Sequence, residues 1–111
     1  MPLQEWSENI WVVRLQDEPA FSDEVLPLID RMEGSPPAQG IVIDFSDVTQ
    51  INSSNLSQLL RVRKASVDAD TGLYLVSPQD AVWSVFLMTG LDKVFQFSQD
   101  TATALTHLQI D

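Results

Sequence analysis

The sequence predicts an α/β fold: a mainly parallel sheet of four to five strands, an N-terminal antiparallel strand pair and about four helices. Short apolar runs typical of buried strands alternate with segments whose apolar residues recur every three or four positions, as they do on helices. From Ile41 onward two successive strand, helix, strand units follow one another, and such units place their strands parallel in one sheet.

The first elements are expected to be a strand pair and a helix. Residues 10–15 are rich in apolar and β-branched side chains, residues 3–6 give a weaker partner strand, and a turn is expected at residues 7–9. An apolar stripe over residues 25–32 predicts a helix that stops at Gly34. We expect this helix to begin between residues 22 and 24, because Pro27 then lies in or just beyond its first turn.

The middle of the chain predicts a central strand and its following helix. Residues 41–45 are almost all apolar, as in a strand covered on both faces. The helix after it is expected to bury a stripe at helical spacing, formed by Leu56, Leu59, Leu60 and Val67. Residues 68–72 then read as a loop and residues 73–76 as a short buried strand.

The last third predicts a helix, a strand and a final helix. Ser77 is the expected N-cap of the first helix, with Pro78 at its first position and Asp80 in its first turn, and the helix runs to Gly90. Residues 94–97 alternate like a strand. Ser98 is expected to begin the final helix, with its apolar positions at Ala102, Leu105 and Leu108.

Length and composition fit one domain over residues 1–111, because 44% hydrophobic residues suffice for a core of this size. The absence of cysteine excludes disulfides, thiolate nucleophiles and thiolate metal sites, and fits a reducing compartment. No stretch resembles an export signal or approaches the roughly 20 apolar residues of a membrane span. We therefore expect a cytoplasmic protein without membrane insertion.

The charge of the chain is strongly acidic. Sixteen acidic and six basic residues give a net charge of −10, which disfavours direct binding to nucleic acid or anionic lipid. Three of the basic residues, Arg61, Arg63 and Lys64, cluster on the helix after the central strand and are expected to form a solvated face.

The inventory of reactive residues argues against an enzyme with a catalytic or cofactor site. The single histidine, His107, lies in the predicted last helix, where we expect it at the surface, and the four glycines are scattered rather than gathered in a phosphate-binding loop. Asp44 and Asp47 flank the end of the central strand and are compatible with a hard cation or with a simple turn. Trp83 is expected to pack in the core or at a helix contact, although an exposed tryptophan would suit an interface.

The junction after the central strand is the most informative part of the chain. Ser53 and Ser54 stand where the next helix is expected to begin, and unpaired N–H groups at a helix N-terminus favour negative charge. A phosphate would be tolerated there and would change the surface shown to a partner. Asn52 and Ser53 are also preferred caps, so the run can equally serve only to cap the helix.

The arrangement resembles the STAS domain family, in particular bacterial anti-sigma factor antagonists. The resemblance covers most of the chain and is clearest over residues 40–97. It is carried by the strand and turn at residues 41–48, the serine junction at residues 51–56, and the later strand, helix and Thr-Gly-Leu run ending at Leu91. Residues 15–20 match the corresponding family turn only loosely.

The resemblance implies a binding module rather than a catalyst. In such proteins the first serine after the aspartate is phosphorylated by a partner kinase that is also the anti-sigma factor, and a serine phosphatase reverses the modification. That position is Ser53, with Ser54 as the fallback. The unphosphorylated form would bind the anti-sigma factor and free the sigma factor. The docking surface is expected to comprise Asn52, Ser53, Ser54, Asn55, Ser57 and Gln58.

Two positions depart from the family pattern: Asn52 stands where aspartate is usual, and Asn55 where glycine is usual. These two departures affect the expected phosphorylation by a kinase more than they affect the expected fold. The alternative is a STAS scaffold that works without phosphate, for example the small subunit of a lipid-transporting ABC complex. No cofactor is expected in either case, and the oligomeric state is left open.

Overall fold

Five strands in the order β1-β2-β3-β4-β5 form one sheet in the computed structural model of the chain, which describes residues 3–7 and 9–110. The strands are β1 (Leu3–Ser7), β2 (Ile10–Gln16), β3 (Gly40–Asp47), β4 (Gly72–Val76) and β5 (Gln96–Ser98). β1 pairs antiparallel with β2, and the other pairings are parallel. The predicted sheet and its antiparallel strand pair are confirmed. Glu8, in the predicted turn at residues 7–9, lies outside the described residues.

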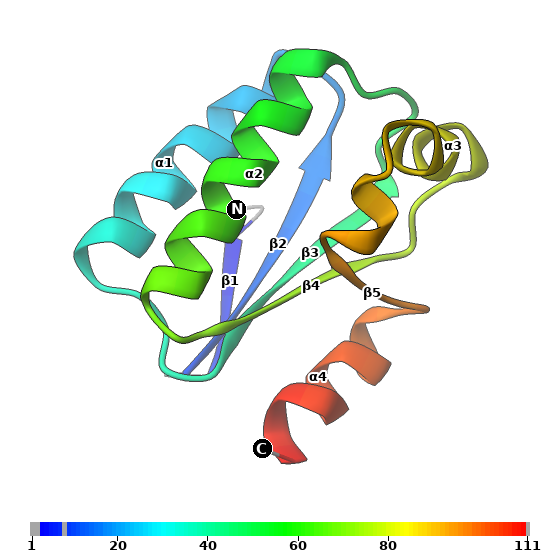
Figure 1. Cartoon of the computed structure of the whole chain (residues 1–111). Coiled ribbons are helices and arrows are strands. Elements are labelled where there is room, and N and C mark those ends of the chain that lie inside the picture. Colours follow the sequence, from blue (N-terminus) through cyan, green and yellow to red (C-terminus); the bar gives the residue numbers. More distant parts are fainter. Residues whose placement is uncertain (1–2, 8, 111) are drawn as a thin grey trace.

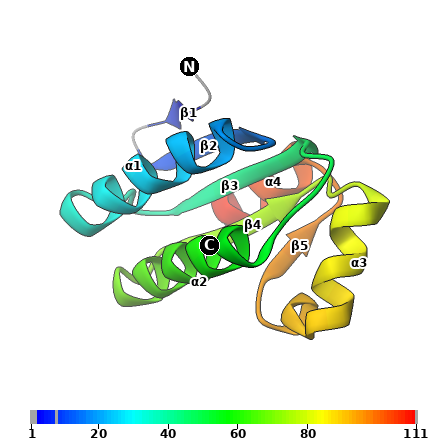
Figure 2. The same ribbon diagram turned by 90° about the horizontal axis from the view of Figure 1, so that it is seen from above.

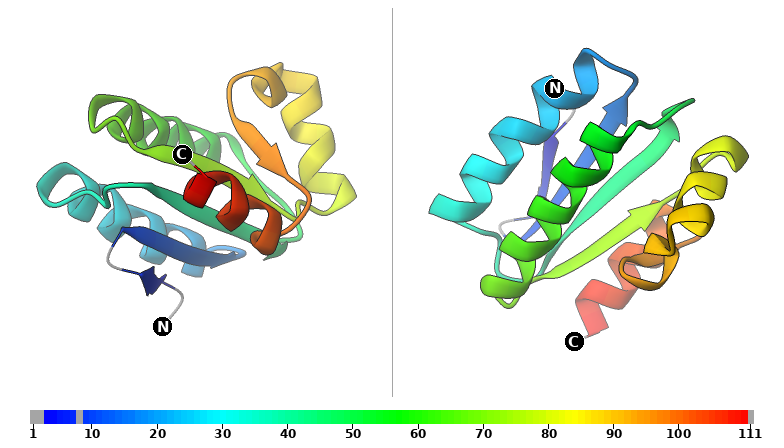
Figure 3. Two further views of the ribbon diagram at one scale, coloured as in Figure 1. Left: turned by 90° about the horizontal axis from the view of Figure 1, so that it is seen from below. Right: turned by 45° about the horizontal axis from the view of Figure 1, so that its top comes forward.

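The described part of the chain contains four α-helices, the number predicted: α1 (Ala20–Gly34), α2 (Ser53–Asp68), α3 (Asp80–Thr89) and α4 (Thr101–Ile110). A short 3-10 helix, η1 (Leu91–Lys93), follows α3. The first three helices lie on one face of the sheet (Figures 1 and 2), whereas α4 lies on the other face (Figure 3). The described residues thus form a single three-layered α/β domain.

The larger core lies between the sheet and the layer of α1, α2 and α3. Its centre is β3, whose first six residues are all buried. Phe45, near the end of β3, meets Phe21 of α1 and Phe86 of α3 edge-on, with ring centroids 6.4 and 6.2 Å apart. Edge-to-face packing fixes the relative placement of aromatic rings. The end of β3, which leads into α2, is therefore held by both neighbouring helices.

A smaller core lies under α4. Its buried residues are Ile10, Val42, Val76, Ala104 and Leu108. Leu108 sits directly on Gly40 of β3 and Gly72 of β4, so closely that a Cβ atom added at Gly72 would lie 2.6 Å from Leu108 Cδ2. The two glycines therefore allow the helix to pack against the strand backbones themselves.

The predicted start of α1 is wrong. The helix begins at Ala20, directly after Pro19, so Pro27 lies in its interior rather than in or near its first turn. Proline has no N–H to donate to the carbonyl of Asp23. Because Pro27 is exposed, that carbonyl is on the side of the helix open to water. The apolar stripe of α1 is as predicted, with Val25, Leu28, Ile29 and Met32 buried.

The starts of α3 and α4 also differ from the prediction. Gln79, not Ser77, is the N-cap of α3, and Ser77 has a φ of 58° while its hydroxyl donates to the Gln99 carbonyl at 3.3 Å. Ser98 ends β5 instead of starting α4, and the Asp100 carboxylate accepts the N–H of Thr103 at 2.8 Å. These serines are placed by contacts between distant segments, which a local cap pattern does not reveal.

The buried stripe of α2 is only partly the predicted one. Leu59 is fully buried and Leu56 is partly buried, but Leu60 and Val67 are 39% and 60% exposed. Val62 takes their place in the core. The helix therefore shows an apolar margin outside its buried face.

Candidate functional site

The start of α2 is closed by a reciprocal pair of asparagines. Asn52 is the N-cap, with the extended backbone usual for a cap, and its Oδ1 accepts the backbone N–H of Asn55 at 2.8 Å. In return, Asn55 Oδ1 accepts the backbone N–H of Asn52 at 3.0 Å. This is a capping box built from two asparagines. Both departures from the family pattern thus have a structural role in this chain.

Ser53 and Ser54 are the first two residues of α2, and both are exposed. Because Asn52 supplies the cap, Ser53 does not need its hydroxyl for that purpose. Backbone N–H groups in the first turn and the positive end of the helix dipole surround both serines. A negatively charged group on either side chain would therefore be favoured by the helix itself.

The other predicted docking residues divide into exposed and covered ones. Asn52 and Ser57 are exposed beside the two serines, and Gln58 is half-buried. Asn55 is only 2% exposed. Its side chain therefore lies beneath the surface that a partner would touch, whereas the other five residues are exposed or half-buried.

Glu18 joins the first turns of two helices. Its carboxylate accepts the backbone N–H and the hydroxyl of Ser22, at 2.7 and 2.6 Å, in the first turn of α1. The same carboxylate accepts Asn55 Nδ2 of α2 at 3.2 Å. The Ser22 hydroxyl, followed by the Ser22 N–H, lowers the pKa of Glu18. Ionised Glu18 is thus the form that holds α1 and α2 together.

Asp17 forms a second connection from the same loop, the segment between β2 and α1. Its carboxylate accepts both the hydroxyl and the N–H of Thr49, and the N–H of Gln50 at 3.3 Å. The Thr49 hydroxyl makes the largest contribution to lowering the pKa of Asp17. Asp17 therefore attaches the β2–α1 loop to the segment that leads from β3 into α2.

A small cavity of about 210 Å³ lies at this junction. It is lined by Glu18, Gln50, Ile51, Asn52 and Asn55. Nearby, Gln58 Nε2 donates to Ser22 Oγ at 3.0 Å, and the Gln58 Oε1 atom is buried without a hydrogen-bond partner among the described residues. The surface around Ser53 is therefore built from two segments, the start of α2 and the β2–α1 loop.

Asp17 and Glu18 are absent from the set of residues predicted from the sequence. The available signal was local: an acidic residue directly before Pro19 and four residues before Ser22, at a helix start. The late predicted start of α1 concealed this signal. The bond to Asn55 spans 37 positions and has no local signature.

The acidic pair at the end of β3 faces an arginine. Arg14 Nε lies 3.6 Å from Asp44 Oδ2 and 3.9 Å from Asp47 Oδ2. Asp44, rather than Asp47, makes the turn contact, because its Oδ1 accepts the N–H of Ser46 at 2.9 Å. Within residues 3–7 and 9–110, no three histidine or acidic side chains are grouped as metal ligands would be. Over the same residues, no helix has the length and apolar character to cross a bilayer.

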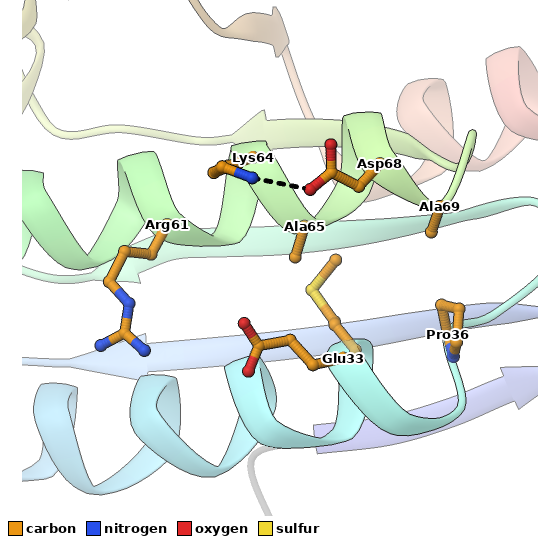
Figure 4. Close-up of a pocket in the computed structure, with 8 residues that line it drawn as sticks. Glu33, Pro36, Arg61, Lys64, Ala65, Asp68 and Ala69 are labelled. Atoms are coloured by element: carbon orange, nitrogen blue, oxygen red, sulfur yellow. Dashed lines mark hydrogen bonds and ion pairs between the residues drawn. The ribbon is translucent and has the colours of Figure 1, made fainter.

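A larger groove lies at the other end of α2, away from the serines. It has a volume of about 390 Å³ and lies between α1 and α2, lined by Met32, Glu33, Pro36, Arg61, Lys64, Ala65, Asp68 and Ala69. Arg61 and Glu33 extend into the gap from opposite helices, and Lys64 pairs with Asp68 on α2 at 2.8 Å (Figure 4). Arg61 and Lys64 are exposed, as predicted for a solvated face.

Two further residues have structural positions. Trp83 is half-buried and packs edge-on against Phe97, with ring centroids 4.9 Å apart, so it belongs to the margin of the core. His107 is exposed, as predicted, and its ring stacks on Tyr74 at 5.6 Å. Neither residue lies among the side chains at the start of α2.

Comparisons with known proteins agree on the family and the fold. The STAS domain family model matches residues 5–104. TM1081 of Thermotoga maritima has a TM-score of 0.83 at 18% identity, covering 97% of this chain and 93% of that one. An anti-sigma-factor antagonist (STAS) domain protein of Planctomyces limnophilus has a TM-score of 0.80 at 18% identity, covering 96% of each chain.

The anti-sigma factor antagonist SpoIIAA, in its unphosphorylated form, has a TM-score of 0.77 at 18% identity, covering 98% of this chain and 96% of that one. At such identities the likeness concerns the fold. No curated protein matches the sequence significantly.

Proposed function

Since the chain belongs to the STAS domain family, a family of binding modules, we propose that it is a protein-binding module controlled by phosphorylation of Ser53. In its unphosphorylated form it binds an anti-sigma factor that is also a serine kinase, and so relieves inhibition of a sigma factor. A serine phosphatase reverses the modification. The module acts in the cytoplasm, has no catalytic activity and does not contact nucleic acid.

The placement of Ser53 is the observation that supports this proposal. The side chain is exposed, it is the first residue of α2, and capping is done by its neighbour Asn52. A kinase can therefore reach the hydroxyl without unfolding the helix start. Ser54, next along the helix and also exposed, is the fallback acceptor.

Phosphate would change the docking surface by its charge. It adds about −1.5 to −2 charges at neutral pH. The nearby loop already carries ionised Asp17 and Glu18, so the surface would become strongly anionic. Burying such a group against a partner costs free energy unless the partner supplies matching cations. Docking through the exposed residues Asn52, Ser54 and Ser57, with half-buried Gln58 at the margin, would then be blocked.

The first prediction compares two substitutions at Ser53. We expect Ser53→Asp to weaken binding to the anti-sigma partner by about tenfold or more relative to Ser53→Ala, because only the aspartate adds charge to the interface. The partner is identified by pull-down from source cells, and its affinity is measured by calorimetry. Ser84→Asp, at an exposed serine of α3, is the matched control for an added carboxylate.

Equal affinity of the two Ser53 variants would refute the switch. Mass spectrometry of the native protein, covering the peptide from Phe45 to Arg61, supplies an independent test under phosphatase inhibition. Phosphate on Ser53 supports the proposal, and phosphate on Ser54 alone moves the acceptor to the fallback site.

A second candidate is a scaffold that never carries phosphate, such as the small subunit of a lipid-transporting ABC complex. The capping box favours it, because Asn52 and Asn55 use their side chains to hold the helix start rather than to meet a kinase. This candidate predicts that pull-down recovers an ATPase subunit instead of a kinase. It also predicts an unmodified Ser53 in every growth state.

A further inference from the structure

The β2–α1 loop and the start of α2 meet at one buried side chain. We propose that Asn55 is a positioning residue that holds this loop, residues 17–19, against α2, so that a partner meets loop and helix as one rigid surface. The role in docking rests on the proposed function. The tether, by which we mean the hydrogen bond from Asn55 to Glu18, is a property of the folded chain and can be tested without a partner.

Asn55 satisfies three hydrogen bonds with one residue. Its backbone N–H donates to Asn52 Oδ1, and its Oδ1 accepts from the Asn52 N–H, which together close the helix start. Its Nδ2 donates to Glu18 Oε2 at 3.2 Å, across to the loop. With 2% of the residue exposed, water has little access to compete for these bonds.

The tether needs an amide at this position. An amide carries an acceptor and a donor on one short side chain, so it can serve the cap and the loop together. Aspartate keeps the acceptor but has no donor for Glu18. Glycine, the usual residue of the family here, has neither group. The link to the loop therefore depends on the amide of Asn55, and Glu18 is its partner.

The loop is held at other points that make the connection rigid. Glu18 also binds the N–H and hydroxyl of Ser22, and Gln58 of α2 donates to that same hydroxyl at 3.0 Å. Glu18, Ser22, Gln58 and Asn55 therefore close a ring that joins the first turns of α1 and α2. Once the bond from Asn55 to Glu18 is cut, the hydrogen bond from Gln58 to Ser22 is the one side-chain hydrogen bond that remains between the two helix starts within residues 3–7 and 9–110.

Amide hydrogen exchange with the full chain tests the tether. In Asn55→Asp the cap acceptor remains, but two carboxylates now face each other, so we expect the Ser22 amide, which is bonded to Glu18, to exchange about tenfold faster. In the double variant Glu18→Gln with Asn55→Asp, donor and acceptor are exchanged, and protection of Ser22 should return to within about threefold of the original. Ser84→Asp, which adds a carboxylate to α3, should leave Ser22 unchanged.

If the double variant restores protection of the Ser22 amide, the two residues act through the bond between them. Two substitutions that damaged the structure independently would instead add their effects on exchange. The proposal is overturned if Asn55→Asp leaves the Ser22 amide as protected as before, or if the double variant exchanges as fast as the single one. Amides of β3 report whether the fold as a whole has loosened.

If Asn55→Asp does not fold, Asn55→Ser provides the same test, because its short hydroxyl remains near Asn52 but does not reach Glu18. Because no partner enters the measurement, a failed tether and a failed phosphorylation switch give different results.

Discussion

The two ends of α2 are held in different ways. At the N-terminal end, Asn52, Asn55 and Glu18 form directional hydrogen bonds, and the residue at their centre is buried. At the C-terminal end, the groove between α1 and α2 is bordered by an ion pair of Lys64 and Asp68, whose side chains are 78% and 64% exposed. The side-chain contacts at the serine end of α2 are thus centred on a buried residue, whereas the ion pair that borders the groove is exposed.

The difference explains why the docking proposal belongs to the N-terminal end. Buried, mutually satisfied hydrogen bonds define one geometry, because each alternative leaves a polar group without a partner. Exposed ion pairs are screened by water and salt and define geometry weakly. A partner at the serines would therefore meet a prepared surface, whereas the groove of Figure 4 is bordered by an exposed ion pair.

The largest difference in stability between the two ends of α2 is expected when the side-chain amide of Asn55 is removed. Asn55→Ala removes the Oδ1 acceptor of the Asn52 N–H and the bond to Glu18, while the backbone N–H of residue 55 still donates to Asn52, and it should lower the free energy of unfolding by about 1–2 kcal/mol. Chemical denaturation followed by circular dichroism measures this change. Ser54→Ala, at the exposed neighbour, should stay within about 0.5 kcal/mol of the original protein. Similar losses for both variants would show that the two positions do not differ as described.

Acid should loosen the serine end of α2, whereas alkali should change only the exposed pair of Lys64 and Asp68 at its other end, with little effect on stability. Because the pKa values of Asp17 and Glu18 are lowered, their contribution to stability is complete above the ordinary carboxyl range near pH 4 and is lost as the pH falls through their native values. The hydrogen bond from Asp68 raises the pKa of Lys64, so its contribution is complete below about pH 10.4 and is lost as the pH rises further.

As the pH falls from about 7 to 3, the NMR shifts of Ser22 and Thr49 should therefore change only at the acid end of this range, because the lowered pKa values of Glu18 and Asp17 delay their protonation. Shifts near Lys64, in the last turns of the helix, should change only above about pH 10.4, because the raised pKa of Lys64 delays the loss of its proton. Asp17→Asn should remove the shift change of Thr49 in acid and leave the shift change near Lys64 in alkali intact. If acid alone, or alkali alone, changed the shifts at both ends of α2 together, the two ends would not titrate independently as we expect.

The smallest effect is expected at the C-terminal end. Lys64→Met removes the partner of Asp68 but keeps a flexible side chain over the groove, and should leave the free energy of unfolding without measurable change, because both groups are exposed. Thermal melts at low and high salt measure it. A clear loss that disappears in high salt would reveal a stronger ion pair than the exposure indicates.

The fold was predictable because its signals are local and periodic. The apolar run at residues 41–45 and the stripe ending at Met32 each reflect burial of one element against the sheet, and burial is visible in spacing. The prediction of Leu60 and Val67 as buried was wrong because both lie one position to the side of the true core face, a margin that spacing alone does not resolve.

The candidate site was predictable only in part. The serines at the start of α2 follow from cap chemistry and the family resemblance, and their exposure is consistent with that role. The contribution of Glu18 was not predictable, since it depends on a contact between segments 37 positions apart. For the same reason Ser77 was misplaced: its hydroxyl is used by Gln99, in a distant loop, and the helix starts later.

The contact of Leu108 with Gly40 and Gly72 has an evolutionary consequence. A Cβ atom added at either glycine would lie within 3 Å of a Leu108 methyl group, so the leucine side chain would have to move to make room for it. Substitutions at the three positions are therefore not independent. Among relatives that keep this helix docking, the three sites should covary, with alanine or serine at position 40 or 72 accompanied by a smaller residue at position 108.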